Sequence, residues 1–65
     1  MTHDEKLITV RAMKKWGGSF VKSLAGTWLL ADDDNDHRIQ AAFPEYMASY
    51  GPGSAKFNAT EQEEA

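Results

Sequence analysis

Aspartates at alternate positions are the clearest candidates for chemistry in this sequence. Asp32-x-Asp34-x-Asp36 copies the first three ligand positions of an EF-hand calcium loop. The rest of that loop is missing, because its sixth position, which needs glycine, is His37, and its twelfth, which needs a bidentate glutamate, is Phe43. The spacing therefore indicates a polar turn that caps a helix, and not a calcium site.

Other residues that could support catalysis lack the partners that such chemistry needs. His3 and His37 are far apart in the sequence, and there is no cysteine, so they make a weak ligand set for zinc. Ser19 has no histidine near it in the sequence and is better placed to cap a helix. The Gly17-Gly18 pair before it lacks the lysine and the spacing of a P-loop. We therefore expect no enzymatic activity and no metal or other cofactor.

The elements that position these residues are predicted to be helices, and the first is expected at about residues 3–16. Thr2 and Glu5 have the spacing of a capping box, in which each side chain accepts from the backbone N–H of the other. Apolar residues then recur every three or four positions, as on one face of a helix. Gly17-Gly18 is expected to end the helix, because glycine accepts the left-handed conformation common at that point.

A second helix is expected at about 19–31, with Ser19 as its N-cap. Its apolar residues follow the spacing of a single helical face and give the clearest amphipathic pattern in the chain. The predicted core combines this face with the apolar stripe of a third helix. Its expected members are Phe20, Leu24, Trp28, Ile39, Phe43 and Tyr46.

The third apolar stripe passes through Pro44. Proline removes a backbone donor and disfavours helical geometry at the preceding residue, Phe43. The third helix is therefore predicted to be kinked or split at Pro44, with pieces at about 35–42 and 44–50. Pro44 would then be the first residue of the second piece.

The expected fold is all-α, a small three-helix bundle with a disordered acidic C-terminal tail. Sixty-five residues form one domain at most and leave a thin margin of stability. We place the helical domain at residues 1–51. Gly51-Pro52-Gly53-Ser54 is expected to close it, and 52–65 is predicted to be a flexible tail, because that segment holds one aromatic residue and three glutamates.

Charge is unevenly distributed along the chain, whose formal net charge is −3. Residues 1–25 carry five basic and two acidic side chains, whereas residues 26–65 carry two basic and eight acidic ones. The polar, acidic N-terminus lacks the features of a signal peptide. Apolar runs fall far short of the ~20 residues that a membrane span needs. We expect a cytoplasmic protein with no membrane partner.

Four basic residues could form a local patch, since Arg11, Lys14 and Lys15 fall on one side of the first helix and Lys22 follows in the second. A glycine pair between two helices also suits a helix-turn-helix motif. DNA-binding domains usually have a pI above ~9, whereas this chain has a pI of about 5.1. A small helix-turn-helix-like DNA-binding regulator is therefore the second interpretation, and nucleic acid the less favoured partner.

The aromatic content is high for this length, with two tryptophans, three phenylalanines and two tyrosines. Trp, Tyr and Arg are enriched among the residues that dominate protein interfaces. Leu30 lies off the main apolar stripe and would extend an exposed apolar surface. We therefore expect a partner-binding surface made of Arg11, Lys14, Lys15, Trp16, Lys22, Leu30 and Tyr50.

The order of several short segments resembles that of short bacteriophage and prophage proteins with a GGSF…LAD…AAFPEY…YGPG layout. The segments are Trp16-Gly-Gly-Ser-Phe, Leu30-Ala-Asp, Ala41-Ala-Phe-Pro-Glu-Tyr and Tyr50-Gly-Pro-Gly. The resemblance covers roughly residues 10–53 and implies a phage accessory protein acting in the cytoplasm of a bacterial host. The expected function is non-enzymatic binding of a host protein, as in host takeover or inhibition of defence. Self-association as a homodimer and a role in virion assembly stay open as alternatives.

Overall fold

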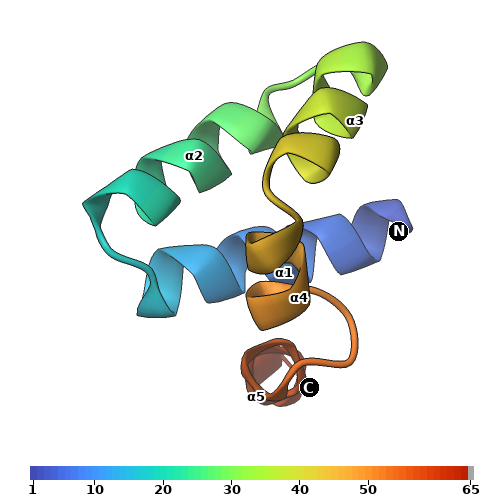
Figure 1. Ribbon diagram of the computed structural model, residues 1–65. Coiled ribbons are helices and arrows are strands. Elements are labelled where there is room, and N and C mark those ends of the chain that lie inside the picture. Colours follow the sequence, from blue (N-terminus) through green and yellow to red (C-terminus); the bar gives the residue numbers. More distant parts are fainter. Residues whose placement is uncertain (65) are drawn as a thin grey trace.

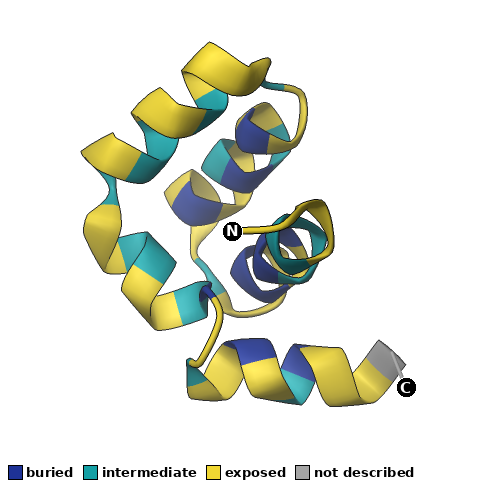
Figure 2. Cartoon of the chain, turned by 90° about the vertical axis from the view of Figure 1, so that its right-hand side faces the viewer, coloured by how far each residue is buried: buried dark blue, intermediate teal, exposed yellow. Residues whose placement is uncertain are grey.

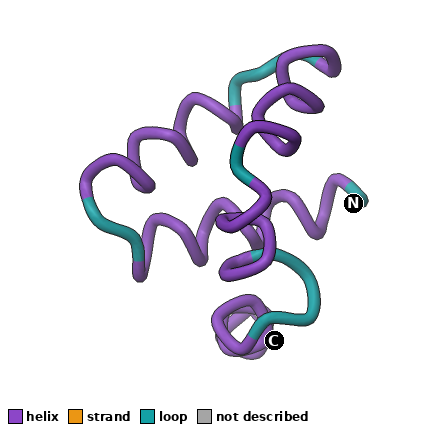
Figure 3. The backbone as a smooth tube through the Cα atoms, viewed as in Figure 1, coloured by secondary structure: helices purple, strands orange, loops and turns teal. Residues whose placement is uncertain are grey.

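The structure is a computed structural model that describes residues 1–64 (Figure 1). The chain is all-helical, and the described residues contain no strand (Figure 3). None of the described helices is long and apolar enough to span a membrane. In chain order the helices are α1 His3–Trp16, α2 Ser19–Leu29, α3 Asp33–Ala42, α4 Pro44–Tyr50 and α5 Ala55–Glu64.

Helix α1 lies at the centre of the arrangement. It packs against α2, α4 and α5, whereas α3 packs only against α2 and α4 (Figure 1). The chain thus folds back along α1 as α2, turns into α3, crosses α1 again as α4 and ends with α5 on the far side of α1. Helix α1 therefore packs against three other helices and reaches α3 through the Lys6 side chain, and it is the main source of core residues.

The capping box predicted for α1 is confirmed. Thr2 Oγ1 accepts from the N–H of Glu5 at 3.1 Å, and Glu5 Oε1 accepts from the N–H of Thr2 at 2.7 Å. The helix ends at Gly17 as expected, but the predicted reason is wrong, since Gly17 is extended with φ −76°. Glycine is needed there because a Cβ would collide with the Val21 side chain and the Met13 carbonyl. The glycine permits a close turn into α2.

The start of α2 differs from the prediction in its cap. Gly18 is the N-cap and Ser19 is already the first helical residue, with no side-chain hydrogen bond to the cap. As the N-cap, Gly18 contributes its carbonyl oxygen, which accepts the first hydrogen bond of the helix from the N–H of Lys22 at 2.9 Å. Glycine is an accepted N-cap residue, although it supplies no side-chain acceptor.

The predicted break at Pro44 is confirmed. Phe43 separates α3 from α4 with φ −128° and ψ 59°, outside helical geometry, and Pro44 is the first residue of α4. This is the restriction that a proline places on the residue before it. Of the two predicted forms, a kinked or a split helix, the chain has the split one, and α3 and α4 run in different directions (Figure 1). Helix α3 begins at Asp33, two residues before its predicted start.

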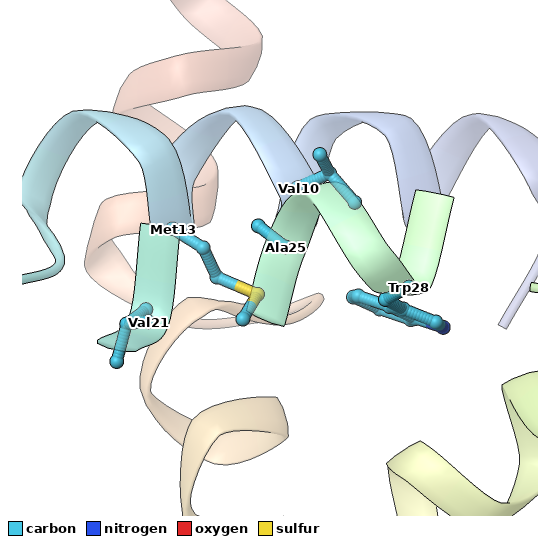
Figure 4. Packing of buried hydrophobic residues seen from close by; sticks show 5 residues of the cluster. All are labelled: Val10, Met13, Val21, Ala25 and Trp28. Carbon is cyan, nitrogen blue, oxygen red and sulfur yellow. The ribbon is translucent and has the colours of Figure 1, made fainter. Parts of the chain in front are cut away.

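The core is smaller than the predicted one and lies mainly between α1 and α2. Val10, Met13, Val21, Ala25 and Trp28 form its central cluster (Figure 4). Of the predicted core residues only Trp28 is buried, while Leu24, Ile39 and Tyr46 pack on the cluster as partly buried residues. The prediction for Phe20 is wrong, because its side chain is 58% exposed. The core therefore depends more on α1 than the apolar pattern indicated.

The C-terminal segment is not the disordered tail that we predicted. Residues 55–64 form α5, which packs against α1 and α4 and buries Phe57 and Thr60. The Thr60 hydroxyl donates to the Lys56 carbonyl at 2.8 Å, so its burial leaves no unpaired donor. Ser54, which was predicted to close the domain, instead caps α5, because its hydroxyl oxygen accepts from the N–H of Phe57 at 3.1 Å. The predicted boundary at residue 51 thus does not separate a folded domain from a tail. The last residue of the predicted tail, Ala65, lies outside the described residues.

Helices α3 and α4, which are described from end to end, contain no buried residue. Figure 2 shows this as an outer layer of exposed and half-buried segments over the buried faces of α1 and α2. Their apolar side chains are only half covered, which leaves apolar surface on this side of the molecule.

Candidate functional site

Two aspartates of the Asp32-x-Asp34-x-Asp36 motif make hydrogen bonds that hold the fold together. Asp32 caps α3 by accepting from the N–H of Asn35 at 2.8 Å. Asp36 lies in the first turn of α3, where Oδ1 accepts from Trp28 Nε1 at 2.9 Å and Oδ2 accepts from Lys6 Nζ at 2.6 Å. The amide of Gln40 donates to the same carboxylate at 2.6 Å. Asp36 thus joins α1, α2 and α3 and satisfies the indole N–H of the buried tryptophan.

Burial alone would raise the pKa of Asp36, because a partly dehydrated carboxylate is disfavoured. The hydrogen bonds from Lys6, Trp28 and Gln40, together with the Lys6 charge, outweigh burial and lower the pKa from its usual 3.8 to about 2. Asp36 is therefore ionised throughout the physiological range. It acts as an acceptor for three donors and offers no proton for acid catalysis near neutral pH.

Acid is expected to remove about 2 kcal/mol of folding stability through Asp36, since each pH unit between the unfolded and folded pKa is worth about 1.4 kcal/mol. The folded pKa is the lower of the two. The contribution is therefore fully present above the unfolded pKa and is lost as the pH falls through the folded pKa. The free energy of unfolding, measured with urea from about pH 5 to about pH 2, should show this loss.

The Asp36→Asn variant should lack this part of the acid dependence. Asp33→Asn is the matched control, because Asp33 lies one turn earlier on α3 and takes no part in the hydrogen bonds to Asp36. Acid profiles of the same shape in wild type and Asp36→Asn would contradict the role of Asp36.

The two histidines, which are far apart in the sequence, line the same polar hollow. It has a volume of about 550 Å³ and is also lined by Lys6, Leu29 and Asp36. Nevertheless, the described residues contain no group of three or more His, Cys, Asp or Glu side chains that could hold a metal ion. Lys6 and Asp36 are engaged with each other at the edge of this hollow.

The predicted basic patch is present in part. Arg11, Lys14, Lys15 and Lys22 are all exposed. Lys15, however, pairs with Glu63 of α5 and lies over the Trp16 ring, with Nζ 4.8 Å from its centroid. The acidic end of α5 thus neutralises part of the positive charge on α1. Among the predicted site residues, the structure brings Lys15 and Trp16 into contact.

Four aromatic rings form a continuous row, here called the aromatic row, from α2 across the α3–α4 junction to α4. Phe20 meets Phe43 edge-to-face at 5.8 Å, and Phe43 stacks on Tyr46 at 5.5 Å. Tyr46 lies 6.5 Å from Tyr50, over which Lys56 of α5 places its ammonium 5.3 Å from the ring centroid. Phe20 is largely exposed and the other three rings are half-buried.

An apolar groove, here called the α2–α3 groove, continues from Phe43 toward the end of α2. It has a volume of about 530 Å³ and runs between the last turn of α2 and one side of α3. Leu30 lies at its edge and is 87% exposed. Its other lining residues are Thr27, Ala31, Asn35, Arg38, Ile39, Ala42 and Phe43.

The predicted site residues therefore divide among separate surfaces. Tyr50 belongs to the aromatic row, Leu30 belongs to the α2–α3 groove, and the basic residues lie toward the junction of α1 and α2. Sequence reasoning missed Phe20 and Phe43 as surface residues, because their spacing matches a buried helical stripe. No signal in the sequence distinguishes that stripe from an exposed row.

No protein-family model, no curated protein and no solved structure matches this chain.

Proposed function

We propose that this chain is a non-enzymatic phage accessory protein that binds a bacterial host protein through the aromatic row. The observation that carries the proposal is the exposure of Phe20, which is 58% accessible at one end of three half-buried rings. Large aromatic side chains that remain accessible in a folded chain are typical anchors of protein interfaces.

The arrangement of the rings suits a surface that binds a partner, because the rings are ordered and yet not fully buried. Each ring is held by its neighbour at 5.5–6.5 Å, so the row is ordered before a partner arrives. An ordered surface loses little side-chain entropy on binding, which raises the affinity available from a small contact area. Tyr46 and Tyr50 add hydroxyl groups that can pair with polar groups of the partner.

The side chains of the aromatic row indicate which kind of partner surface would fit them. Phe20 and Phe43 need apolar side chains against them, whereas the Lys56 ammonium over Tyr50 favours a carboxylate at that end. We therefore propose a partner surface with an apolar centre and an acidic edge. The resemblance to short phage and prophage proteins supports a bacterial host protein as the partner and the host cytoplasm as the place of action.

A DNA-binding regulator is the alternative, and it rests on the exposed Lys14 and Lys22 near the junction of α1 and α2. Two features weigh against it. Lys15 is paired with Glu63, and the chain as a whole has a net charge of −3. A DNA-binding surface needs several free cations, because its affinity comes largely from neutralised phosphates.

Phe20→Ser is expected to weaken binding of the host protein by about 30-fold, the effect of losing a dominant interface residue. The tagged chain would first be used to capture proteins from nuclease-treated bacterial lysate, and the retained protein would then be purified and titrated against both variants. Leu29→Ser is the matched control, because Leu29 is an apolar residue of the same helix, 40% exposed, outside the aromatic row.

Equal affinities of the Phe20→Ser and Leu29→Ser variants would contradict the proposed surface, and the absence of any stoichiometric host protein would contradict the proposed function. DNA retained without nuclease and released by salt would support the regulator instead. In that case the double variant Lys14→Ala, Lys22→Ala should lose DNA affinity and Phe20→Ser should not.

A further inference from the structure

The outer side of α3 and the end of α2 offer a surface suited to another helix. Ala41 and Ala42 are both exposed on the last turn of α3, and their small side chains permit close approach of a second backbone. Leu30 lines the α2–α3 groove together with Ala42, and 87% of its surface is exposed. The same surface therefore contains both a protruding apolar side chain and an apolar recess.

This combination is what a symmetric interface requires. In a two-fold dimer the same patch is used by both copies, so a protrusion must fit a recess on the same patch. Leu30 of each copy can enter the α2–α3 groove of the other. The interior of that groove is lined by small and apolar residues, among them Ala31, Ile39 and Ala42.

The charges on α3 are arranged in the same self-complementary way. Asp34 and Arg38 are four residues apart, both exposed, and thus adjacent on one face of the helix. This spacing suits an ion pair within the helix, yet the structure shows none between them among the described residues. When two copies of α3 run antiparallel, Asp34 of each copy lies opposite Arg38 of the other, which gives two equivalent pairs of opposite charge.

We propose that the α2–α3 groove binds a second copy of this chain, with the two α3 helices antiparallel across a two-fold axis. Leu30 of each copy fills the groove of the other, and Asp34 and Arg38 form ion pairs between the copies.

The size of the chain favours a second copy at this surface. A stable interface covers about 800 Å² on each partner, which is about a fifth of the 4050 Å² that this chain exposes. Chains this small often gain stability by oligomerisation, because a single core buries too little apolar surface. Helix α3 has no buried residue in the single chain and would gain the most. The inference does not depend on the proposed function: Phe43 borders both surfaces, but Phe20, Tyr46 and Tyr50 of the aromatic row do not line the groove.

Sedimentation equilibrium of the full chain at several concentrations tests the dimer. The expected mass of the wild type is twice the 7.2 kDa of one chain. Leu30→Lys should weaken the dimer by about 30-fold or more, because it places a charge in an apolar groove next to Arg38. Leu29→Lys is the matched control, since Leu29 faces the polar hollow and should leave the dimer unchanged.

The ion pairs are tested by exchanging their charges. Asp34→Arg and Arg38→Asp should each weaken the dimer by about tenfold at low salt, because each brings like charges together twice. The double variant should restore the dimer to near wild-type affinity, since it rebuilds both pairs with the signs exchanged. A wild type that is monomeric at all concentrations, a dimer unaffected by Leu30→Lys, or a double variant as weak as the single ones would overturn the proposal. Circular dichroism of each variant verifies that its helices are intact.

Discussion

Trp28→Ala is expected to cost about 3–5 kcal/mol of folding stability, the usual range for truncating a fully buried tryptophan. The Trp28 side chain is completely inaccessible and belongs to the same buried cluster as Val10 and Met13 of α1 (Figure 4). Its loss would also deprive Asp36 of a hydrogen bond. A domain of this length has a total stability of about 3–10 kcal/mol, so the variant should lose a large share of its stability. Urea denaturation followed by circular dichroism measures the change.

Two other tryptophan variants separate the causes of this loss. Trp16→Ala is the control, because Trp16 is 39% exposed at the end of α1 and should cost about 1 kcal/mol or less. Trp28→Phe keeps most of the packing but removes the indole N–H, so its cost should lie between the other two. If Trp16→Ala were as destabilising as Trp28→Ala, the core would have to lie elsewhere than between α1 and α2.

Phe57→Ala is expected to cost about 3–4 kcal/mol, because Phe57 is the large apolar side chain that fixes α5 against the rest of the molecule. The sequence alone predicted a disordered tail, in which the same substitution would have almost no effect on stability. The free energy of unfolding of this variant therefore distinguishes a packed α5 from a flexible tail.

Phe20→Ala is the control for this experiment. Phe20 is also a helical phenylalanine with ring contacts, but it is 58% exposed and its truncation should cost less than about 1 kcal/mol. Removal of residues 55–65 should destabilise the chain at least as much as Phe57→Ala, because it uncovers the side of α1 on which α5 packs. Wild-type stability of the truncated chain would show that α5 adds nothing to the fold.

The two phenylalanine variants also bear on function. A residue that contributes little to stability but remains large, apolar and accessible is free to serve a partner, and Phe20 has these properties. Phe57, by contrast, is buried and is expected to contribute strongly to stability. Loss of host-protein binding in the Phe57→Ala variant would be explained by unfolding, whereas loss in a Phe20 variant with normal stability would mark a direct contact.

The surfaces on the two sides of Phe43 suggest a division of roles. The aromatic row has ordered rings and a cation at one end, which suit a protein of different composition. The α2–α3 groove has opposite charges side by side on α3, which suit a copy of itself. A dimer built on the groove would carry two copies of the aromatic row, and two such rows can bind a paired partner more tightly than one.

Local signals in the sequence determined most of the helix boundaries. The capping box of Thr2 and Glu5 fixed the start of α1, and Pro44 fixed the break between α3 and α4. These features depend on hydrogen bonds and steric contacts within a few residues, so they can be predicted without knowing the fold. The all-helical class follows from the same periodic patterns.

The burial of particular side chains was decided by the tertiary structure. Phe20 and Phe57 are both aromatic residues in helical segments, yet Phe20 is exposed and Phe57 is buried. The difference arises because α5 returns to α1 and buries Phe57, while the Phe20 ring lies on the outer side of α2 and meets the rings of Phe43 and Tyr46. Contacts between helices distant in sequence cannot be derived from the periodicity of either helix alone.

The same reason explains why the role of Asp36 and the division of the surface were not predicted. The sequence predicted that one of the aspartates before Asn35 would cap this helix, and Asp32 does so. Lys6 and Trp28 reach Asp36 only because α1, α2 and α3 come together in the fold. The groove beside Leu30 exists only because α2 and α3 lie next to each other in the way they do. Short-range hydrogen bonds and steric contacts determine where each helix begins and ends. The packing of whole helices against one another determines which side chains stay exposed and can contact a partner.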